Sequence, residues 1–103
     1  MMSVFSVTNQ NFDDKVLRAG RPVLLDFWAP WCGPCKLLSP VVEEIARRHP
    51  EIGVGKINVD EERELTARFG VSGIPALFYM KDGRVAASAV GVRPRESVEA
   101  MLK

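Results

Sequence analysis

Trp31-Cys32-Gly33-Pro34-Cys35 contains the only two cysteines among 103 residues, and the rest of the sequence is organised around this stretch. An apolar run that is typical of a strand, residues 23–28, leads into it, and a run that is typical of a helix, residues 36–48, follows it. In the first turn of a helix, residues i and i+3 lie on one face, close enough for a disulfide after a small adjustment. A strand that ends at Cys-x-x-Cys and opens a helix is typical of a redox site.

The two residues between the cysteines suit this position. Pro34 fits a first helical turn, because its ring presets φ and its missing N–H would have no partner there. Gly33 keeps side-chain bulk away from the sulfurs and lets another backbone come close. We therefore assign both residues to the tuning of the redox pair.

The position of each cysteine predicts its role. Cys32 is expected at the helix N-terminus, where unpaired N–H groups and the positive end of the helix dipole favour the thiolate. The thiolate is the nucleophilic form. Cys35 lies one turn further in and is expected to be more buried. The sequence thus predicts that Cys32 attacks a partner's disulfide and that Cys35 resolves the mixed disulfide.

The run Trp28-Ala29-Pro30-Trp31-Cys32-Gly33-Pro34-Cys35-Lys36 resembles the active-site signature of the thioredoxin family. The resemblance continues along essentially the whole chain, with matches at Asp26, Pro40, Lys56, Gly73-Ile74-Pro75 and Gly91. It implies an α/β thioredoxin fold, with a central five-stranded mixed sheet flanked by four helices. The chain departs from the family at Pro30, where an acidic residue is common, and at Ala76, where threonine is common; both bear on substrate preference.

The resemblance also implies roles outside the cysteine pair. Asp26 is the one acid in an apolar strand, so burial should raise the pKa of its carboxyl, and the family assigns such a residue to proton exchange with the second cysteine. The peptide bond before Pro75 is implied to be cis, which would turn the backbone of Ile74 outward beside the cysteines, where an extended substrate segment could pair with it. The substrate-binding rim around Cys32 is expected to consist of Trp31, Val59, Gly73, Ile74, Pro75, Val90 and Gly91.

Simpler interpretations stand beside several of these assignments. Lys56 is an isolated charge that either lies near Asp26 and modulates it, as the resemblance implies, or is a surface lysine whose stem lies along the sheet.

A structural zinc needs four ligands, and the chain offers only His49 and carboxylates besides the cysteines, so redox chemistry is favoured. Trp28 continues the strand and is expected in the core. His49 is expected to complement a helix dipole.

Composition limits the remaining possibilities. A chain with 47% hydrophobic residues is expected to form one small domain over residues 1–103. A net charge of +1 does not suggest binding to nucleic acid or to an anionic membrane. Residues 1–14 lack the basic start and apolar core of a signal peptide, and Asp26 interrupts the longest apolar run. Two cysteines are too few for a secreted disulfide scaffold, so a reducing, cytoplasmic location is expected. The protein is also expected to be a monomer.

Hydrophobic periodicity and turn signals predict strands alternating with helices, followed by a hairpin and a last helix. Asp60 is expected to cap a helix, and Asp82-Gly83 to form the hairpin turn. Strands are predicted at 4–7, 23–28, 53–59, 76–81 and 84–90, with helices at 10–18, 36–48, after Asp60 and from about Pro94.

The resemblance implies a general protein-disulfide reductase that receives electrons of NADPH through a thioredoxin reductase and uses no bound metal or cofactor. Two alternatives remain open. An oxidant or isomerase of the same fold is disfavoured by Gly33-Pro34, where such proteins tend to carry histidine, and would show a much more oxidising reduction potential. A binding module that serves as a subunit of a partner would keep its role after replacement of both cysteines.

Overall fold

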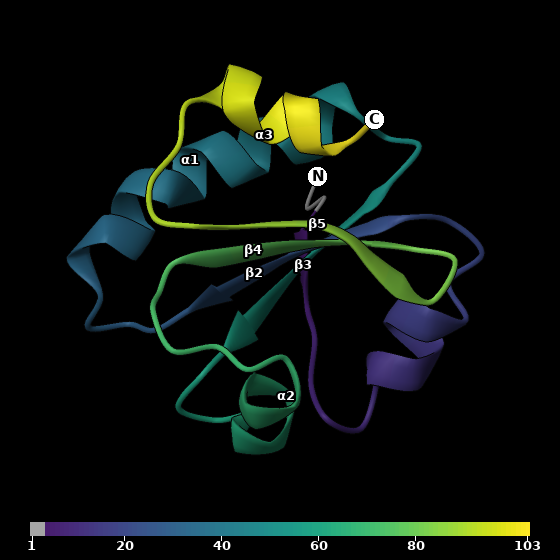
Figure 1. Ribbon diagram of the computed structural model, residues 1–103, viewed down its shortest axis with the longest axis horizontal. Coiled ribbons are helices and arrows are strands. Elements are labelled where there is room, and N and C mark those ends of the chain that lie inside the picture. The colour runs from purple at the N-terminus through teal and green to yellow at the C-terminus, as the bar shows by residue number, and fades with distance from the viewer. Residues whose placement is uncertain (1–3) are drawn as a thin grey trace.

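The structure, a computed structural model, describes residues 4–103. The prediction about a signal peptide concerned residues 1–14, and its first three residues, Met1, Met2 and Ser3, lie outside the described part. Within these residues a central mixed sheet has helices on both faces (Figure 1). The elements in chain order are β1 (Val4–Ser6), the π-helix η1 (Asp13–Leu17), β2 (Val23–Trp28), α1 (Gly33–Arg48), β3 (Gly53–Asn58), α2 (Arg63–Arg68), β4 (Ala76–Lys81), β5 (Arg84–Val90) and α3 (Arg95–Met101).

The strand order is β1-β3-β2-β4-β5. β1, β3 and β2 run parallel, whereas β4 is antiparallel to β2 and β5 to β4. This confirms the five-stranded mixed sheet flanked by four helices. The predicted hairpin is confirmed as well, because Asp82 (φ 54°) and Gly83 (φ 76°) both adopt the positive φ that a tight two-residue turn requires.

Each face of the sheet carries an apolar core, and the central strand β2 contributes to both. On the face covered by η1 and α2, four phenylalanine rings contact one another with centroids 5.1 to 5.8 Å apart: Phe12, Phe27, Phe69 and Phe78. On the opposite face, Leu24 packs with buried side chains of α1 and α3, namely Leu38, Val42, Ile45 and Val98. Burial on both faces explains why β2 is almost continuously apolar. In the described part of the chain, no helix combines the length and apolar character needed to cross a membrane.

The first predicted helix, residues 10–18, is wrong in extent. Thr8 and Asn11 instead close a turn reciprocally: the Thr8 N–H donates to Asn11 Oδ1 at 2.8 Å, and the Asn11 N–H donates to Thr8 Oγ1 at 3.1 Å. These side chains satisfy two backbone N–H groups as a capping box does, and residues 9–11 form a turn before the helix begins. The π-helix follows, and it ends with the Arg18 N–H donating to the carbonyl of Asp13, five residues back.

The predicted cap at Asp60 is also wrong, because α2 begins only at Arg63. The side chain of Asn58 accepts the Asp60 N–H at 2.9 Å and closes an Asx turn after β3. The backbone N–H groups of Glu61 and Glu62 donate to the Asn58 carbonyl in the same turn. Asp60 is thereby held in the loop, outside the helix.

The topology brings three loops to one edge of the sheet. β2 and the parallel strand β3 end at this edge, and the antiparallel strand β4 begins there. The residues that follow Trp28, those that follow Asn58 and those that precede Ala76 therefore meet. The Val59 N–H donates to the Trp28 carbonyl at 2.9 Å, which ties two of these loops together. The cysteine pair lies at this edge.

Candidate active site

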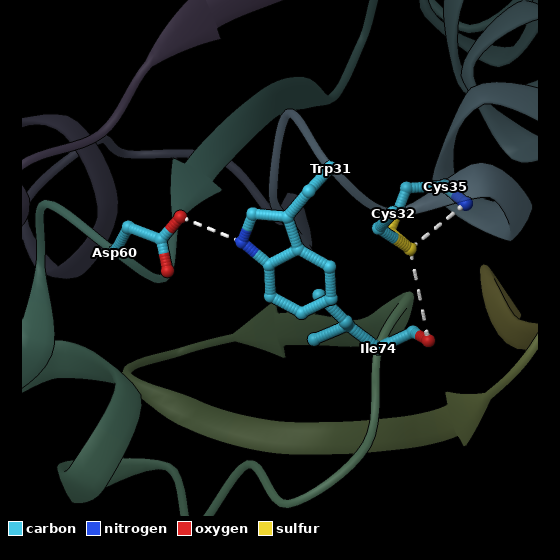
Figure 2. Close-up of a disulfide and its surroundings, with 5 residues drawn as sticks. All are labelled: Trp31, Cys32, Cys35, Asp60 and Ile74. Carbon is cyan, nitrogen blue, oxygen red and sulfur yellow. Dashed lines mark hydrogen bonds between the residues drawn. A yellow bond between two sulfur atoms is a disulfide. The ribbon is translucent and has the colours of Figure 1, made fainter.

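Cys32 and Cys35 form a disulfide at the N-terminus of α1, with Cα atoms 5.3 Å apart. Cys32 is the N-cap residue, with extended backbone (φ −89°, ψ 109°), and its Sγ accepts the N–H of Cys35 at 3.1 Å. Figure 2 shows this contact as a dashed line. The sulfur of Cys32 therefore occupies the place of a capping side chain, facing the unpaired N–H groups of the first turn.

The loop before β4 covers the disulfide. The carbonyl oxygen of Ile74 lies 4.0 Å from Cys32 Sγ (Figure 2). The side chains of Val59 and Ile74 pack against the cluster that the two cysteines form with Ala29. The Ile74–Pro75 bond is cis, which confirms the isomer that the family resemblance implies.

The expected difference in burial between the two cysteines is wrong for this oxidised form. Each is only 4% exposed. The reason is the loop before β4, which covers Cys32 with Ile74 and its carbonyl. The open side is at Gly33, where an added Cβ would meet no atom within 4 Å. The space beside Gly33 is therefore open, whereas both cysteines are covered.

Trp31 stands beside the disulfide and is 69% exposed, in line with its predicted role as a contact residue. Its indole N–H donates to Asp60 Oδ2 at 2.8 Å (Figure 2). Trp28, expected in the core, is only half-buried. Sequence reasoning missed the role of Asp60. The signal that would have found it is the parallel pairing of β2 with β3, which places residues after both strands at one edge.

The remaining rim residues gather around the start of β4 and the end of β5. An added Cβ on Gly73 would lie 3.5 Å from Cγ1 of Val90, and the Gly91 N–H donates to the Pro75 carbonyl at 2.8 Å. Val90 is 62% exposed. Of the predicted rim, only Val59 and Ile74 are packed against the cysteine cluster among the described residues, while Gly73 lies next to Val90 and Gly91 next to Pro75.

Asp26 lies on the face of β2 that α1 covers. Its side chain is 1% exposed, and its Oδ1 has no hydrogen-bond partner within residues 4–103. Burial raises the pKa of Asp26 to about 6, and the positive charge of Lys56 partly opposes this increase. The predicted burial of Asp26 is therefore confirmed.

Lys56 is the partner of Asp26 in the parallel register of β2 and β3. Its Nζ donates to Ser39 Oγ at 3.3 Å and lies 4.8 Å from the centroid of the Trp28 ring. Over the described chain it makes no ion pair with Asp26. It is thus close enough to influence the carboxyl without pairing with it. Nothing in the sequence pattern pointed to Ser39.

His49 lies at the C-terminal end of α1, away from the disulfide. Its ring nitrogens contact Glu51 at 3.2 Å and Glu99 at 3.0 Å, and the hydrogen bond to Glu99 in particular raises the pKa of His49. Across residues 4–103, no three histidine, cysteine or acidic side chains are grouped as metal ligands. The cysteine sulfurs bond to each other.

The chain matches the family model described as Thioredoxin over residues 3–103. It is 43% identical over 101 residues to the thioredoxin of Alicyclobacillus acidocaldarius, covering 97% of this chain and 95% of that protein. It is 43% identical over 100 residues to the thioredoxin of Pseudomonas aeruginosa (96% and 93%), and 39% over 102 residues to that of Bacillus subtilis (98% and 96%). Together with the disulfide at the start of α1, these matches show that the chain belongs to the thioredoxin family and is a thiol–disulfide oxidoreductase.

Proposed function

We propose that this protein is a general reductant of protein disulfides, with Cys32 as the nucleophile and Cys35 as the resolving residue. The observation that carries the assignment is the N-cap position of Cys32, whose Sγ accepts the Cys35 N–H. In the reduced protein, the same N–H and the helix dipole stabilise a thiolate at Cys32. Cys35 lies inside the first turn of α1, so its sulfur is not at the N-cap.

The exchange proceeds in two balanced steps. The Cys32 thiolate attacks one sulfur of a substrate disulfide, the Cys32–substrate bond forms, and the second substrate sulfur leaves as a thiolate that takes up a proton. Cys35 then loses its proton and attacks Cys32 Sγ, which releases the first substrate sulfur and closes the Cys32–Cys35 disulfide. Two electrons pass to the substrate. Gly33 and Pro34 tune the pair by leaving it accessible and by starting α1 in helical geometry.

Asp26 is the proposed acceptor of the Cys35 proton. It lies on the face of β2 that is covered by α1, the helix that carries Cys35. Its Oδ1 has no partner in the described part of the chain, so a lone pair is open to a proton. With a pKa of about 6, it is ionised at neutral pH but much less acidic than an exposed aspartate. Lys56 modulates this acidity.

Substrates are proposed to dock on the rim beside the disulfide. An extended segment next to the substrate disulfide pairs with the backbone at Gly73 and Ile74. The side chains and backbone around it are supplied by Trp31, Val59, Pro75, Val90 and Gly91. Exposed apolar groups at Trp31 and Val90 suit many unfolded or flexible partners.

Trp31→Ala tests this rim. The variant is expected to lower kcat/KM for insulin about tenfold, because an exposed aromatic contact is lost from the docking surface. Reduction of a small disulfide such as oxidised glutathione should change much less, because that molecule is too small to cover the rim. Val85→Ala, which trims an exposed apolar side chain at the far end of β5, is the control. Equal losses on both substrates would remove Trp31 from substrate binding.

A thioredoxin reductase is proposed to return the disulfide to the dithiol with electrons of NADPH, with the protein working as a monomer in the cytoplasm. The test is NADPH consumption in a mixture of this protein, a thioredoxin reductase and insulin. We expect turnover that depends on all three components and a reducing midpoint potential near that of other thioredoxins. No insulin reduction, or a much more oxidising potential, would favour the oxidant or isomerase alternative.

A further inference from the structure

The ammonium of Lys56 occupies an unusual place for a lysine in a sheet. Its stem starts beside Asp26 in the register of β2 and β3, and paired residues in neighbouring strands project from the same face. A lysine on a partly buried surface ordinarily extends its charged end to water. Here the Nζ atom donates to Ser39 Oγ on α1 at 3.3 Å and lies 4.8 Å from the centroid of the Trp28 ring.

Two observations show that Lys56 and Asp26 do not form an ion pair. Asp26 Oδ1 has no hydrogen-bond partner in residues 4–103, and Lys56 forms no ion pair with it there. The charge of Lys56 nevertheless acts on the carboxyl. Ser39 is the one hydrogen-bond partner of this ammonium within the described chain. Its hydroxyl and the Trp28 ring are therefore the two contacts that bear on where this charge lies.

We propose that Ser39 is a positioning residue of the redox site: its hydroxyl, together with the ring of Trp28, holds the ammonium of Lys56 at a fixed place beside the Asp26 carboxyl. The consequence for catalysis rests on the proposed role of Asp26 as the proton acceptor. The positioning itself rests only on the contacts of Ser39 and Lys56.

Within residues 4–103, Lys56 is the one charged group that acts on the Asp26 carboxyl. Leu77 of β4 is the register partner of Asp26 on the other side, and the Cys35 sulfur of α1 carries no charge in the disulfide. The charged side chains of α1 and α3 are exposed or paired with one another: Lys36, Glu43, Arg47 and Glu96 are exposed, Arg48 and Arg95 bind Glu44, and Glu99 binds His49. Ser39 thus acts on Asp26 through Lys56.

The experiment measures the carboxyl of Asp26 directly, by carbon NMR titration of the oxidised protein. In Ser39→Ala the ammonium is released toward water, so the titration midpoint of Asp26 should rise by about half a pH unit, the scale expected when one ammonium moves a few ångströms away. Lys56→Met should raise it further. Ser39→Thr keeps the hydroxyl and should keep the wild-type midpoint. Alanine is a better helix former than serine, so the fold of α1 is retained.

The double variant Ser39→Ala/Lys56→Met separates positioning from a general structural effect. If Ser39 acts through Lys56, the double variant has the midpoint of Lys56→Met alone. Additive shifts, or a midpoint that is unchanged or lowered in Ser39→Ala, would overturn the proposal.

The pH profile of insulin reduction tests the catalytic consequence separately. An NMR shift accompanied by the same displacement of the profile supports both the positioning and the proton role of Asp26. An NMR shift without displacement of the profile would leave Ser39 as the positioning residue of Lys56 and would remove Asp26 as proton acceptor. No NMR shift contradicts the role of Ser39, whatever the kinetics show.

Discussion

Cys32→Ser is expected to abolish the reduction of insulin, with a loss of at least about a thousandfold, because it removes the attacking sulfur. Cys35→Ser is expected to be equally inactive in turnover but to behave differently in a single encounter. It retains the Cys32 thiolate, attacks the substrate disulfide and then stops, because no thiol remains to resolve the product. A covalent adduct with the substrate should therefore accumulate in Cys35→Ser.

Mass spectrometry of each variant after incubation with a disulfide-bearing protein measures the adducts. The double variant Cys32→Ser/Cys35→Ser is the control for non-covalent association. Because both cysteines are 4% exposed in the oxidised form, exposure does not predict the order of reaction. The prediction depends on stabilisation of the Cys32 thiolate by the Cys35 N–H and the helix dipole. Equal trapping by both single variants, or stronger trapping through Cys35, would reverse the roles of attacker and resolver.

Local signals in the sequence predicted most of the sheet. Strand β4 and strand β5 have the predicted bounds, because Asp82-Gly83 sets the turn and Gly91 (φ 99°) ends the second strand. The two-sided burial of β2 follows from its apolar run. Strand order came from the family resemblance, because periodicity shows which face a residue occupies but not which strand lies beside it.

The parts of the site that could not be predicted depend on contacts between distant segments. The Trp31–Asp60 hydrogen bond joins residues that are 29 positions apart, and the Lys56–Ser39 bond joins residues 17 positions apart. No local sequence pattern predicts either hydrogen bond. The burial of Cys32 likewise comes from Ile74, 42 positions away, which a helix-terminus argument does not include.

Asp26→Asn is expected to stabilise the oxidised protein at pH 8 and to do so much less at pH 4. Folding raises the pKa of Asp26 from 3.8 to about 6, mainly through burial. A raised acid pKa means that the folded state holds its proton more tightly than the unfolded state. Well below pH 3.8 the carboxyl is neutral in both states, so it carries no charge penalty. As the pH rises to 6, the unfolded state ionises first, and the folded state loses stability.

The size of this effect follows from the difference between 6 and 3.8, about 2 pH units, at 1.36 kcal/mol each, which gives about 3 kcal/mol. Asparagine removes the titration but leaves a buried polar group at every pH. The informative quantity is therefore the difference in unfolding free energy between variant and wild type. It should grow by about 2 kcal/mol from pH 4 to pH 8, because the unfolded carboxyl is already about half ionised at pH 4.

Denaturant unfolding of the oxidised proteins at pH 4, 6 and 8 measures this difference. Asp82→Asn removes a carboxyl from the exposed β4–β5 turn and is the matched control for the loss of one negative charge. Solvent screens that exposed charge, so the control should show a much smaller change with pH. A gain in Asp26→Asn that is the same at pH 4 and pH 8 would mean that the carboxyl is hydrated in solution. Asp26 would then be too acidic to take a proton from Cys35, and the proton-transfer step proposed for it would fail together with the stability prediction.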